Sequence, residues 1–174
     1  RYTMDDDYVD AVLTAFIRLY EEGLIYRGNR ITNWCPHDRS AISDLEVNYE
    51  EVEGNLYGIR YPFVDGKGPG PDGEGYAQVF STRPETMLGD VALVVNPEDP
   101  RYTDLVGRKV VVPFVEREIE IFADEHVDPE FGTGVLKVTP AHDPNDFEIV
   151  RRLGLEPVNV MNPDATINEA GGPF

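Results

Sequence analysis

The stretch LKVTPAHDPNDFE, residues 136–148, joins a predicted β-strand to the start of a predicted helix. Side chains alternate along a strand, so Lys137 and Thr139 share one face, while the apolar residues between and before them are expected to face the core. Asp143 is a suitable N-cap, and Pro144 fits the first helical position. The stretch therefore predicts a strand, a short loop and a capped helix.

The polar residues of this stretch allow two interpretations. Helix capping accounts for Asp143, and a carboxylate at Asp146 interacts favourably with the helix dipole. Capping does not explain why Lys137 and Thr139 share a face directly before that helix start, and their grouping indicates a pocket. His142 and the two aspartates could instead supply metal ligands, but the lysine would place a positive charge beside the ion, so no metal is expected.

Repeated short strands dominate the chain from Gly54 onward. Strand composition marks residues 55–64, 76–82, 91–96, 108–115, 117–123, 135–139 and 156–162. In residues 117–123 glutamates alternate with isoleucines, which is typical of a strand with one face exposed to solvent. Many short strands with few helices favour a closed barrel or sandwich over a doubly wound sheet. The predicted fold class is mainly β with peripheral helices (α+β).

The chain before Gly54 predicts a helix and a hairpin. Apolar residues recur at helical spacing before Gly23, at Val9, Val12, Leu13, Phe16, Ile17 and Tyr20. Residues 24–34, LIYRGNRITNW, predict two short strands about a Gly28–Asn29 turn, followed by a loop over CPHDRS. We expect residues 1–48 to lead into a β-rich unit at 49–174. Within that unit, residues 65–75 contain five Gly and two Pro and predict a flexible loop.

Composition limits the possible partners. The 174-residue chain carries 33 acidic and 15 basic residues, a formal net charge of −18 that repels phosphate at long range. We therefore do not expect this unit to hold nucleic acid unaided. A single cysteine, Cys35, forbids an internal disulfide and fits a reducing cytosol. The longest apolar run, residues 110–115, is too short to span a membrane, and a start at Arg1 without signal-peptide features is typical of a fragment excised from a longer protein.

A second polar motif is STRPETMLGD, residues 81–90. A strand ends near Thr82, and Pro84 can open a turn or a short helix. Arg83, taken alone, fits an exposed ion-pair partner as well as a binding residue.

Taken together, the motifs resemble a known family. STRPETMLGDVALVVNPEDPRY, GTGVLKVTPAHDPNDFE and PVNVMNPDATINEAGGPF resemble the editing insertion of valyl-tRNA synthetases, and the upstream EEGLIYRGNRITNWCP and SAISDLEVNYEE resemble the segment leading into it. The resemblance covers nearly the whole chain apart from the Gly/Pro loop. It implies a closed β-barrel core of the class I synthetase editing-domain type, inserted between the halves of a Rossmann-type catalytic domain. No HIGH or KMSKS signature is present, so ligation of valine with ATP and magnesium is expected of the parent enzyme, and no cofactor is expected in this fragment.

The resemblance also implies roles for particular residues. Asp146 would hold the substrate's α-ammonium group, and Lys137 and Thr139 would line the side-chain pocket. Asp143 belongs to the same motif. The predicted catalytic residues are thus Asp143, Asp146 and Lys137, and the predicted substrate-binding residues are Arg83, Thr86, Lys137, Thr139, Asp143 and Asp146, with the first two on the wall near the terminal adenosine or the scissile ester.

The implied reaction is hydrolysis of threonyl-tRNA(Val) at its aminoacyl ester, without a covalent intermediate. Asp143, a bound water and the substrate's own ribose hydroxyl are all candidates for the base. The implied partners are the 3′-terminal adenosine of mischarged tRNA(Val) and the remainder of the synthetase, in the cytoplasm and without a membrane. Two rivals stay open: a metal-dependent hydrolase built on His142, Asp143 and Asp146, and a fragment that merely docks tRNA.

One departure from the family concerns its zinc site. Relatives often carry Cys-x-x-Cys where this chain has WCPHD, with Asp38 in place of the second cysteine. Cys35 and His37 are either remnants of that site or parts of an ordinary turn, and the turn is favoured because one thiolate and one imidazole make a poor tetrahedral ligand set.

Overall fold

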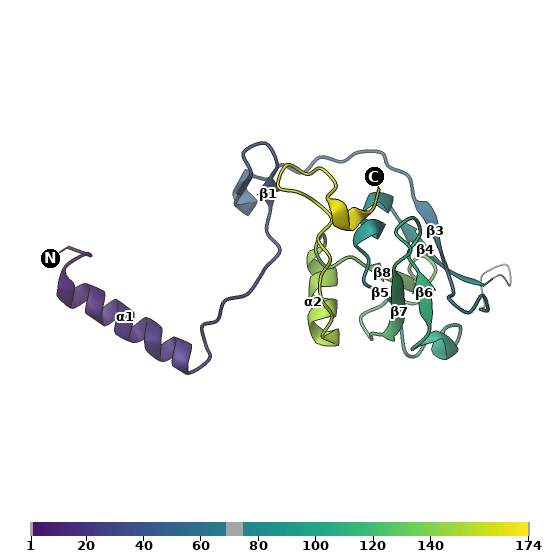
Figure 1. Cartoon of the computed structure of the whole chain (residues 1–174), viewed down its shortest axis with the longest axis horizontal. Coiled ribbons are helices and arrows are strands. Elements are labelled where there is room, and N and C mark those ends of the chain that lie inside the picture. Colours follow the sequence, from purple (N-terminus) through teal and green to yellow (C-terminus); the bar gives the residue numbers. More distant parts are fainter. Residues whose placement is uncertain (1, 69–74, 174) are drawn as a thin grey trace. The chain divides into compact units, whose positions relative to one another are not determined.

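The computed structural model describes residues 2–68 and 75–173 and divides into two compact units, Arg1–Arg30 and Ile31–Phe174 (Figure 1). The first unit contains the helix α1 (Asp6–Glu21), which begins with two acidic residues and ends before Gly23, whose φ is 73°. The predicted helix is confirmed. None of its residues is buried within this chain. No helix in the described residues is both long and apolar enough to cross a membrane.

The second unit opens with a small hairpin at a different place from the predicted one. β1 (Trp34–Cys35) pairs with β2 (Ser40–Ala41), so the chain turns at residues 36–39. The predicted hairpin over residues 24–34 is wrong, because an isolated two-stranded ribbon gains little in water and residues 24–33 are mostly exposed. The real hairpin is anchored by the Trp34 Nε1, which donates to the Pro163 carbonyl oxygen at 2.8 Å. The short helix η1 (Asp44–Glu46) follows.

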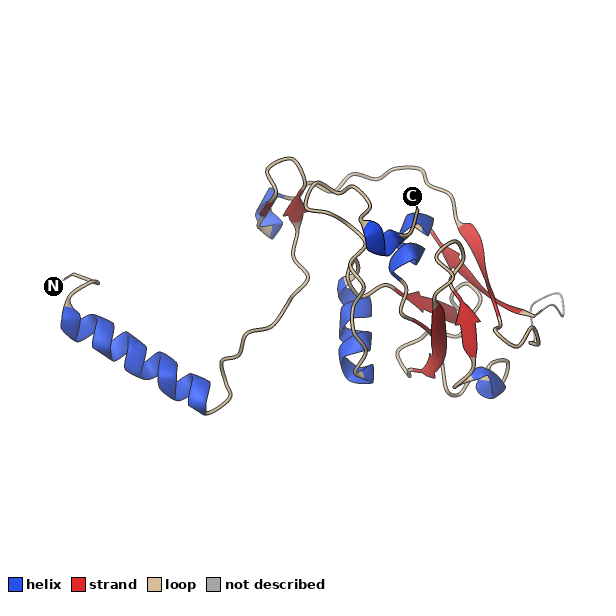
Figure 2. Ribbon diagram, viewed as in Figure 1, coloured by secondary structure: helices blue, strands red, loops and turns tan. Residues whose placement is uncertain are grey.

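Two further sheets follow in this unit (Figure 2). The larger has the order β6-β7-β5-β8, with β5 (Ala92–Val95), β6 (Lys109–Val111), β7 (Glu118–Ala123) and β8 (Val135–Val138). β5 and β7 are parallel, and the other two pairs are antiparallel. The smaller sheet pairs β3 (Tyr57–Pro62) with β4 (Tyr76–Ser81) in antiparallel register. Of the loop predicted over residues 65–75, residues 69–74 lie outside the described residues.

Of the strands predicted from Gly54 onward, those up to residue 139 are confirmed, but the one predicted over residues 156–162 is wrong. That segment contributes only an isolated bridge between Met161 and Ile167. Its backbone forms local turns instead, because the Asn162 N–H donates to the Thr166 carbonyl at 2.8 Å. The C-terminal segment is therefore a loop, which ends in the short helix η4 (Glu169–Gly171).

Apolar side chains form two cores, one on each face of the larger sheet. The first lies between the two sheets and includes Ile59, Tyr61, Phe63, Val79, Leu93, Val95, Val110, Ile119 and Ile121. The second lies between the larger sheet and the helix α2 (Pro144–Leu153) and includes Val94, Val138, Ile149 and Val150. β5 is buried on both faces, as its unbroken apolar sequence predicts. The alternation in β7 is also confirmed, because its isoleucines are buried and its glutamates are not.

The predicted closed barrel is not found in the described residues. β3 approaches β6 through a single bridge, Phe63 to Val110, and through the Val64 N–H, which donates to the Lys109 carbonyl at 3.1 Å. β4 lies near β8, but no ladder joins them, and the hydroxyl of Thr133 donates to the Gln78 carbonyl beside this seam at 2.6 Å. Strand composition predicts which face is buried but not which edges pair, so closure could not be read from it. The coarser prediction, a mostly β fold with few helices, is confirmed.

Candidate functional site

A cavity of about 340 Å³ opens at the unpaired seam between β4 and β8. Its walls come from the end of β4, the short helix η2 (Pro84–Gly89), β8 and the start of α2. All six residues predicted for the site line it: Arg83, Thr86, Lys137, Thr139, Asp143 and Asp146. Phe80, Ser81, Thr82, Leu136 and His142 complete the wall. The structure thus brings together two segments about fifty residues apart in the sequence.

The first wall is shaped by the turn that follows β4. The Ser81 hydroxyl oxygen accepts from the Arg83 N–H at 3.1 Å. Pro84 begins η2, so of the predicted turn or short helix the structure has the short helix. The Thr86 hydroxyl donates to the Arg83 carbonyl oxygen at 2.9 Å. Arg83 is exposed, and no side chain among residues 2–68 and 75–173 forms an ion pair with its guanidinium. This wall therefore offers a cation at the rim and a fixed hydroxyl oxygen inside.

The second wall is the polar face of β8. Lys137 is 7% exposed and Thr139 is 1% exposed, while Val138 packs on the opposite face beneath α2. The Lys137 Nζ donates to the Thr86 Oγ1 at 2.8 Å and to the Thr139 Oγ1 at 2.6 Å. The predicted shared face is confirmed, and it is as buried as the apolar one.

The start of α2 forms the third wall. Asp143 is the N-cap, and its Oδ1 accepts from the backbone N–H groups of Asn145 and Asp146 at 2.8 and 3.2 Å. Asp146 is only 8% exposed, and its Oδ2 accepts from the Thr139 N–H at 2.8 Å. Burial raises the pKa of Asp146 to about 6, although the Thr139 N–H opposes that shift. The capping interpretation of Asp143 is confirmed, and the cap lies in the same cavity as the buried carboxylate.

His142 lies between these walls. Its Nε2 accepts from the Val160 N–H at 3.3 Å, which places the ring proton on Nδ1. Burial, together with the charge of Lys137, lowers the pKa of His142, so the ring is neutral near pH 7. It can offer one N–H to a ligand.

Asp90 is the residue that the sequence analysis missed. Its side chain is fully buried, and its Oδ1 accepts from the Lys137 Nζ at 3.2 Å and from the Thr139 hydroxyl at 2.5 Å. Its Oδ2 accepts from the Tyr61 hydroxyl at 2.5 Å. The signal available in the sequence was an acid placed directly before the apolar run of β5, where a strand core leaves little room for an unpaired charge.

Comparison with known proteins decides the family. The family of class I tRNA synthetases (I, L, M and V) matches residues 1–164. The chain belongs to this family.

Several valine–tRNA ligases are similar to this synthetase segment. Those of Clostridium tetani and Synechocystis are 54% and 56% identical over 99% and 100% of the chain. The ligase of Geobacter sulfurreducens is 56% identical over 98% of it. The chain spans only about 18–19% of the length of these relatives. The resemblance to valyl-tRNA synthetases is therefore confirmed.

A solved structure titled "The crystal structure of GlLeuRS-CP1" also matches, with a TM-score of 0.40 and 19% identity. The match covers 45% of this chain and 44% of that one.

The position at which the resemblance implied a zinc motif is occupied by a turn in this synthetase segment. The Cys35 Sγ lies 3.5 Å from the Asp38 Oδ2, and His37 is exposed. In the part of the chain that the structure describes, no group of three or more His, Cys, Asp or Glu side chains could hold a metal ion. The absence of a metal remains a prediction.

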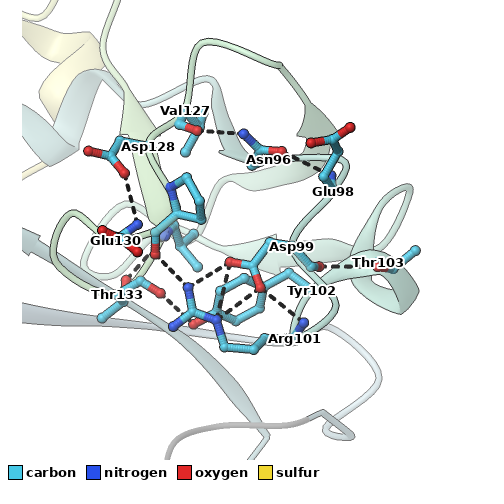
Figure 3. A network of polar contacts seen from close by, with 12 residues as sticks. Asn96, Glu98, Asp99, Arg101, Tyr102, Thr103, Val127, Asp128, Glu130 and Thr133 are labelled. Atoms are coloured by element: carbon cyan, nitrogen blue, oxygen red, sulfur yellow. Dashed lines mark hydrogen bonds and ion pairs between the residues drawn. The ribbon is translucent and has the colours of Figure 1, made fainter.

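A second cavity of about 240 Å³ adjoins the first at Phe80 and Leu136, and residues 126–136 line most of it. A polar network holds this loop (Figure 3). Arg101 binds the buried Asp99 at 2.6 Å and donates to the Pro129 carbonyl, also at 2.6 Å. The Tyr102 hydroxyl donates to the Thr133 carbonyl at 2.7 Å. The synthetase segment thus fixes the loop that leads into β8.

Proposed function

We propose that this chain is the editing segment of a valyl-tRNA synthetase and that the seam cavity hydrolyses threonyl-tRNA(Val) at its aminoacyl ester. The observation that carries the proposal is the convergence of six polar side chains from two remote segments in one cavity. A volume of about 340 Å³ lies within the range of small-molecule sites. The names of the similar ligases supply valine and the tRNA, and threonine follows from the resemblance.

Editing would compensate for a physical limit of the site at which the complete synthetase activates its amino acid. Threonine and valine have nearly the same shape, and an apolar pocket cannot strongly reject an isostere that adds only a hydroxyl. A second site can reverse the preference if it hydrogen-bonds that hydroxyl, because valine would leave the polar groups unpaired. The buried Lys137 and Thr139 give the cavity this polar character.

Asp146 is proposed to hold the substrate's α-ammonium group. Its Oδ2 accepts from the Thr139 N–H, which leaves Oδ1 to accept from a ligand in the cavity that Asp146 lines. A cation bound there would favour the ionised carboxylate that burial otherwise disfavours. Arg83, at the rim, is proposed to contact the terminal nucleotide.

The reaction is attack by water on the ester carbonyl carbon. The water oxygen bonds to that carbon, the bond to the ribose oxygen breaks, and the ribose oxygen takes up a proton. The products are threonine and uncharged tRNA. Asp143 lies on the cavity wall and is proposed to orient the water, with its other oxygen retained by the helix cap. The general base is Asp143, a second water or the ribose hydroxyl.

The proposal includes the surroundings of the segment. Residues 1–48 would lead into the insertion, and residues 49–174 would form the editing unit. The partners would be the 3′-terminal adenosine of mischarged tRNA(Val) and the rest of the synthetase. The complete enzyme would ligate valine with ATP and magnesium in the cytoplasm, whereas editing would require no cofactor.

The test is deacylation of threonyl-tRNA(Val) by the complete synthetase carrying Asp146→Asn. The amide can still accept the Thr139 N–H but cannot neutralise an ammonium group. We expect hydrolysis to fall by about 10-fold or more, in line with the loss of a charge-assisted contact. Mischarged tRNA should accumulate, while valine-dependent ATP–pyrophosphate exchange stays unchanged.

Glu148→Gln is the matched control. It removes one negative charge from the same helix, at an exposed position paired with Arg151. Its hydrolysis rate should equal that of the wild type. Wild-type hydrolysis in Asp146→Asn would refute the assigned role of Asp146, and an inactive wild-type enzyme would refute the proposed function.

A further inference from the structure

Lys137 has no hydrogen left to offer a ligand. An ammonium group has three N–H donors, and those of Lys137 point to the Oγ1 of Thr86, the Oγ1 of Thr139 and the Oδ1 of Asp90. The Lys137 side chain is only 9% exposed. It therefore organises the cavity wall and cannot itself recognise a substrate hydroxyl without giving up an internal bond.

The two hydroxyl groups around Lys137 have also used their hydrogens. Thr139 donates its proton to the Asp90 Oδ1, and Thr86 donates its proton to the Arg83 carbonyl oxygen. Each oxygen accepts one bond from Lys137 and keeps a second lone pair. Thr86 and Thr139 therefore present acceptors to the cavity.

Asp90 fixes this arrangement for Thr139. Its carboxylate accepts from the Lys137 ammonium, the Thr139 hydroxyl and the Tyr61 hydroxyl, so each of its hydrogen-bond partners among residues 2–68 and 75–173 is a donor. Burial raises the pKa of Asp90, and the charge of Lys137 is the strongest opposing influence. Burial also raises the pKa of Tyr61, which keeps its hydroxyl protonated as a donor. With its proton drawn to Asp90, Thr139 can only accept from a ligand.

We propose that Asp90, which does not line the cavity, is a positioning residue that sets the hydrogen-bond polarity of the side-chain pocket. By drawing the Thr139 proton inward and pairing Lys137, it leaves a pocket that recognises a substrate whose side chain donates a hydrogen bond. A β-hydroxyl amino acid satisfies that requirement, and a purely aliphatic one leaves the acceptors unpaired. This inference rests on the proposed editing function.

The experiment measures how much the substrate hydroxyl contributes to the rate of hydrolysis. The complete synthetase is given tRNA(Val) acylated with threonine or with 2-aminobutyrate, which lacks the hydroxyl, and kcat/KM for hydrolysis is compared. We expect the wild type to prefer the threonyl ester by about 10- to 100-fold, as one buried hydrogen bond predicts. In Asp90→Asn the amide can donate to Thr139 and turn its proton into the cavity, so the preference should fall to within about 3-fold of unity.

Tyr61→Phe is the control for disturbance of the core. It removes one hydrogen bond to Asp90 but leaves the contacts with Lys137 and Thr139. Its preference for the threonyl ester should match that of the wild type. A loss of preference in Tyr61→Phe as large as that in Asp90→Asn would overturn the proposal, as would an unchanged preference in Asp90→Asn.

A measurement on the wild type covers the case in which Asp90→Asn does not fold. O-methylthreonine has a side-chain oxygen that accepts but cannot donate. Its tRNA ester should be hydrolysed no faster than the 2-aminobutyryl ester, and hydrolysis as fast as that of the threonyl ester would overturn the inference. An enzyme inactive on all three esters would contradict the proposed function instead.

Discussion

At Asp146 the proposed function conflicts with the stability of the fold. The carboxylate is buried beside an aspartate cap and accepts one backbone N–H, so its ionised form is costly in the free protein. A bound ammonium group would remove that cost. Residues kept at such an energetic disadvantage are typical of binding sites.

The pH dependence of stability tests this conflict. The folded-state pKa of Asp146 is about 6, above the value of 3.8 expected in the unfolded chain. The folded state therefore holds this proton more tightly, and the stability that the neutral form confers is lost as pH rises from about 4 to about 6. In Asp146→Asn the side chain at position 146 no longer titrates. At pH 7 this variant of the 174-residue chain should therefore be more stable than wild type by on the order of 1–3 kcal/mol.

Urea denaturation between pH 4 and pH 7 measures the difference. The gap between Asp146→Asn and wild type should widen with pH and level off above about 6. Glu148→Gln should show no comparable gap. If Asp146→Asn were less stable than wild type at pH 7, the ionised carboxylate would stabilise the fold instead of destabilising it.

At the scale of elements, α2 combines a structural and a proposed chemical role. Its N-cap Asp143, its first residue Pro144 and its αL C-cap Gly154 follow from the sequence, because each acts within a single turn. Asp143 also lines the cavity. That position depends on how α2 packs against β8 and not on the local sequence. Capping and chemistry can therefore be separated by substitution.

Asp143→Ser should separate them. Serine is a good N-cap and should keep the free energy of unfolding within about 0.5 kcal/mol of wild type, whereas Asp143→Ala should lose about 1 kcal/mol. If Asp143 orients the attacking water, both variants of the complete synthetase should hydrolyse threonyl-tRNA(Val) about 10-fold or more slowly. Full activity in Asp143→Ser would reduce the role of this residue to capping.

At the scale of the whole chain, the net charge opposes the proposed substrate. A formal charge of −18 repels the phosphates of tRNA, and the proposal assigns most phosphate contacts to the rest of the synthetase. The segment would then need to hold only the terminal nucleotides.

An inverted salt dependence should result. When the isolated 174-residue chain deacylates threonyl-tRNA(Val), its kcat/KM should rise as salt increases from about 50 to about 200 mM, because screening weakens the repulsion. The complete synthetase, at the same magnesium concentration, should show the ordinary decrease. A steep decrease for the isolated chain would indicate a cationic tRNA-binding surface on this segment.

The sequence by itself determined most of the elements between Gly54 and Gly154 and six of the residues that line the cavity. Alternation placed Lys137 and Thr139 on one face, capping rules placed the start of α2, and the paired motifs named six residues that line one cavity. These signals are short-range, because each depends on neighbours within a few residues along the chain.

The tertiary structure alone decided the rest. Within residues 2–68 and 75–173 the sheets do not close into a barrel, and the first hairpin lies at residues 34–41. Asp90 is buried where Tyr61, Lys137 and Thr139 meet. Edge pairing, burial of a charge and the direction of a hydroxyl proton all depend on groups that are remote in the sequence. No local pattern encodes them, because their energies arise only when those groups come into contact.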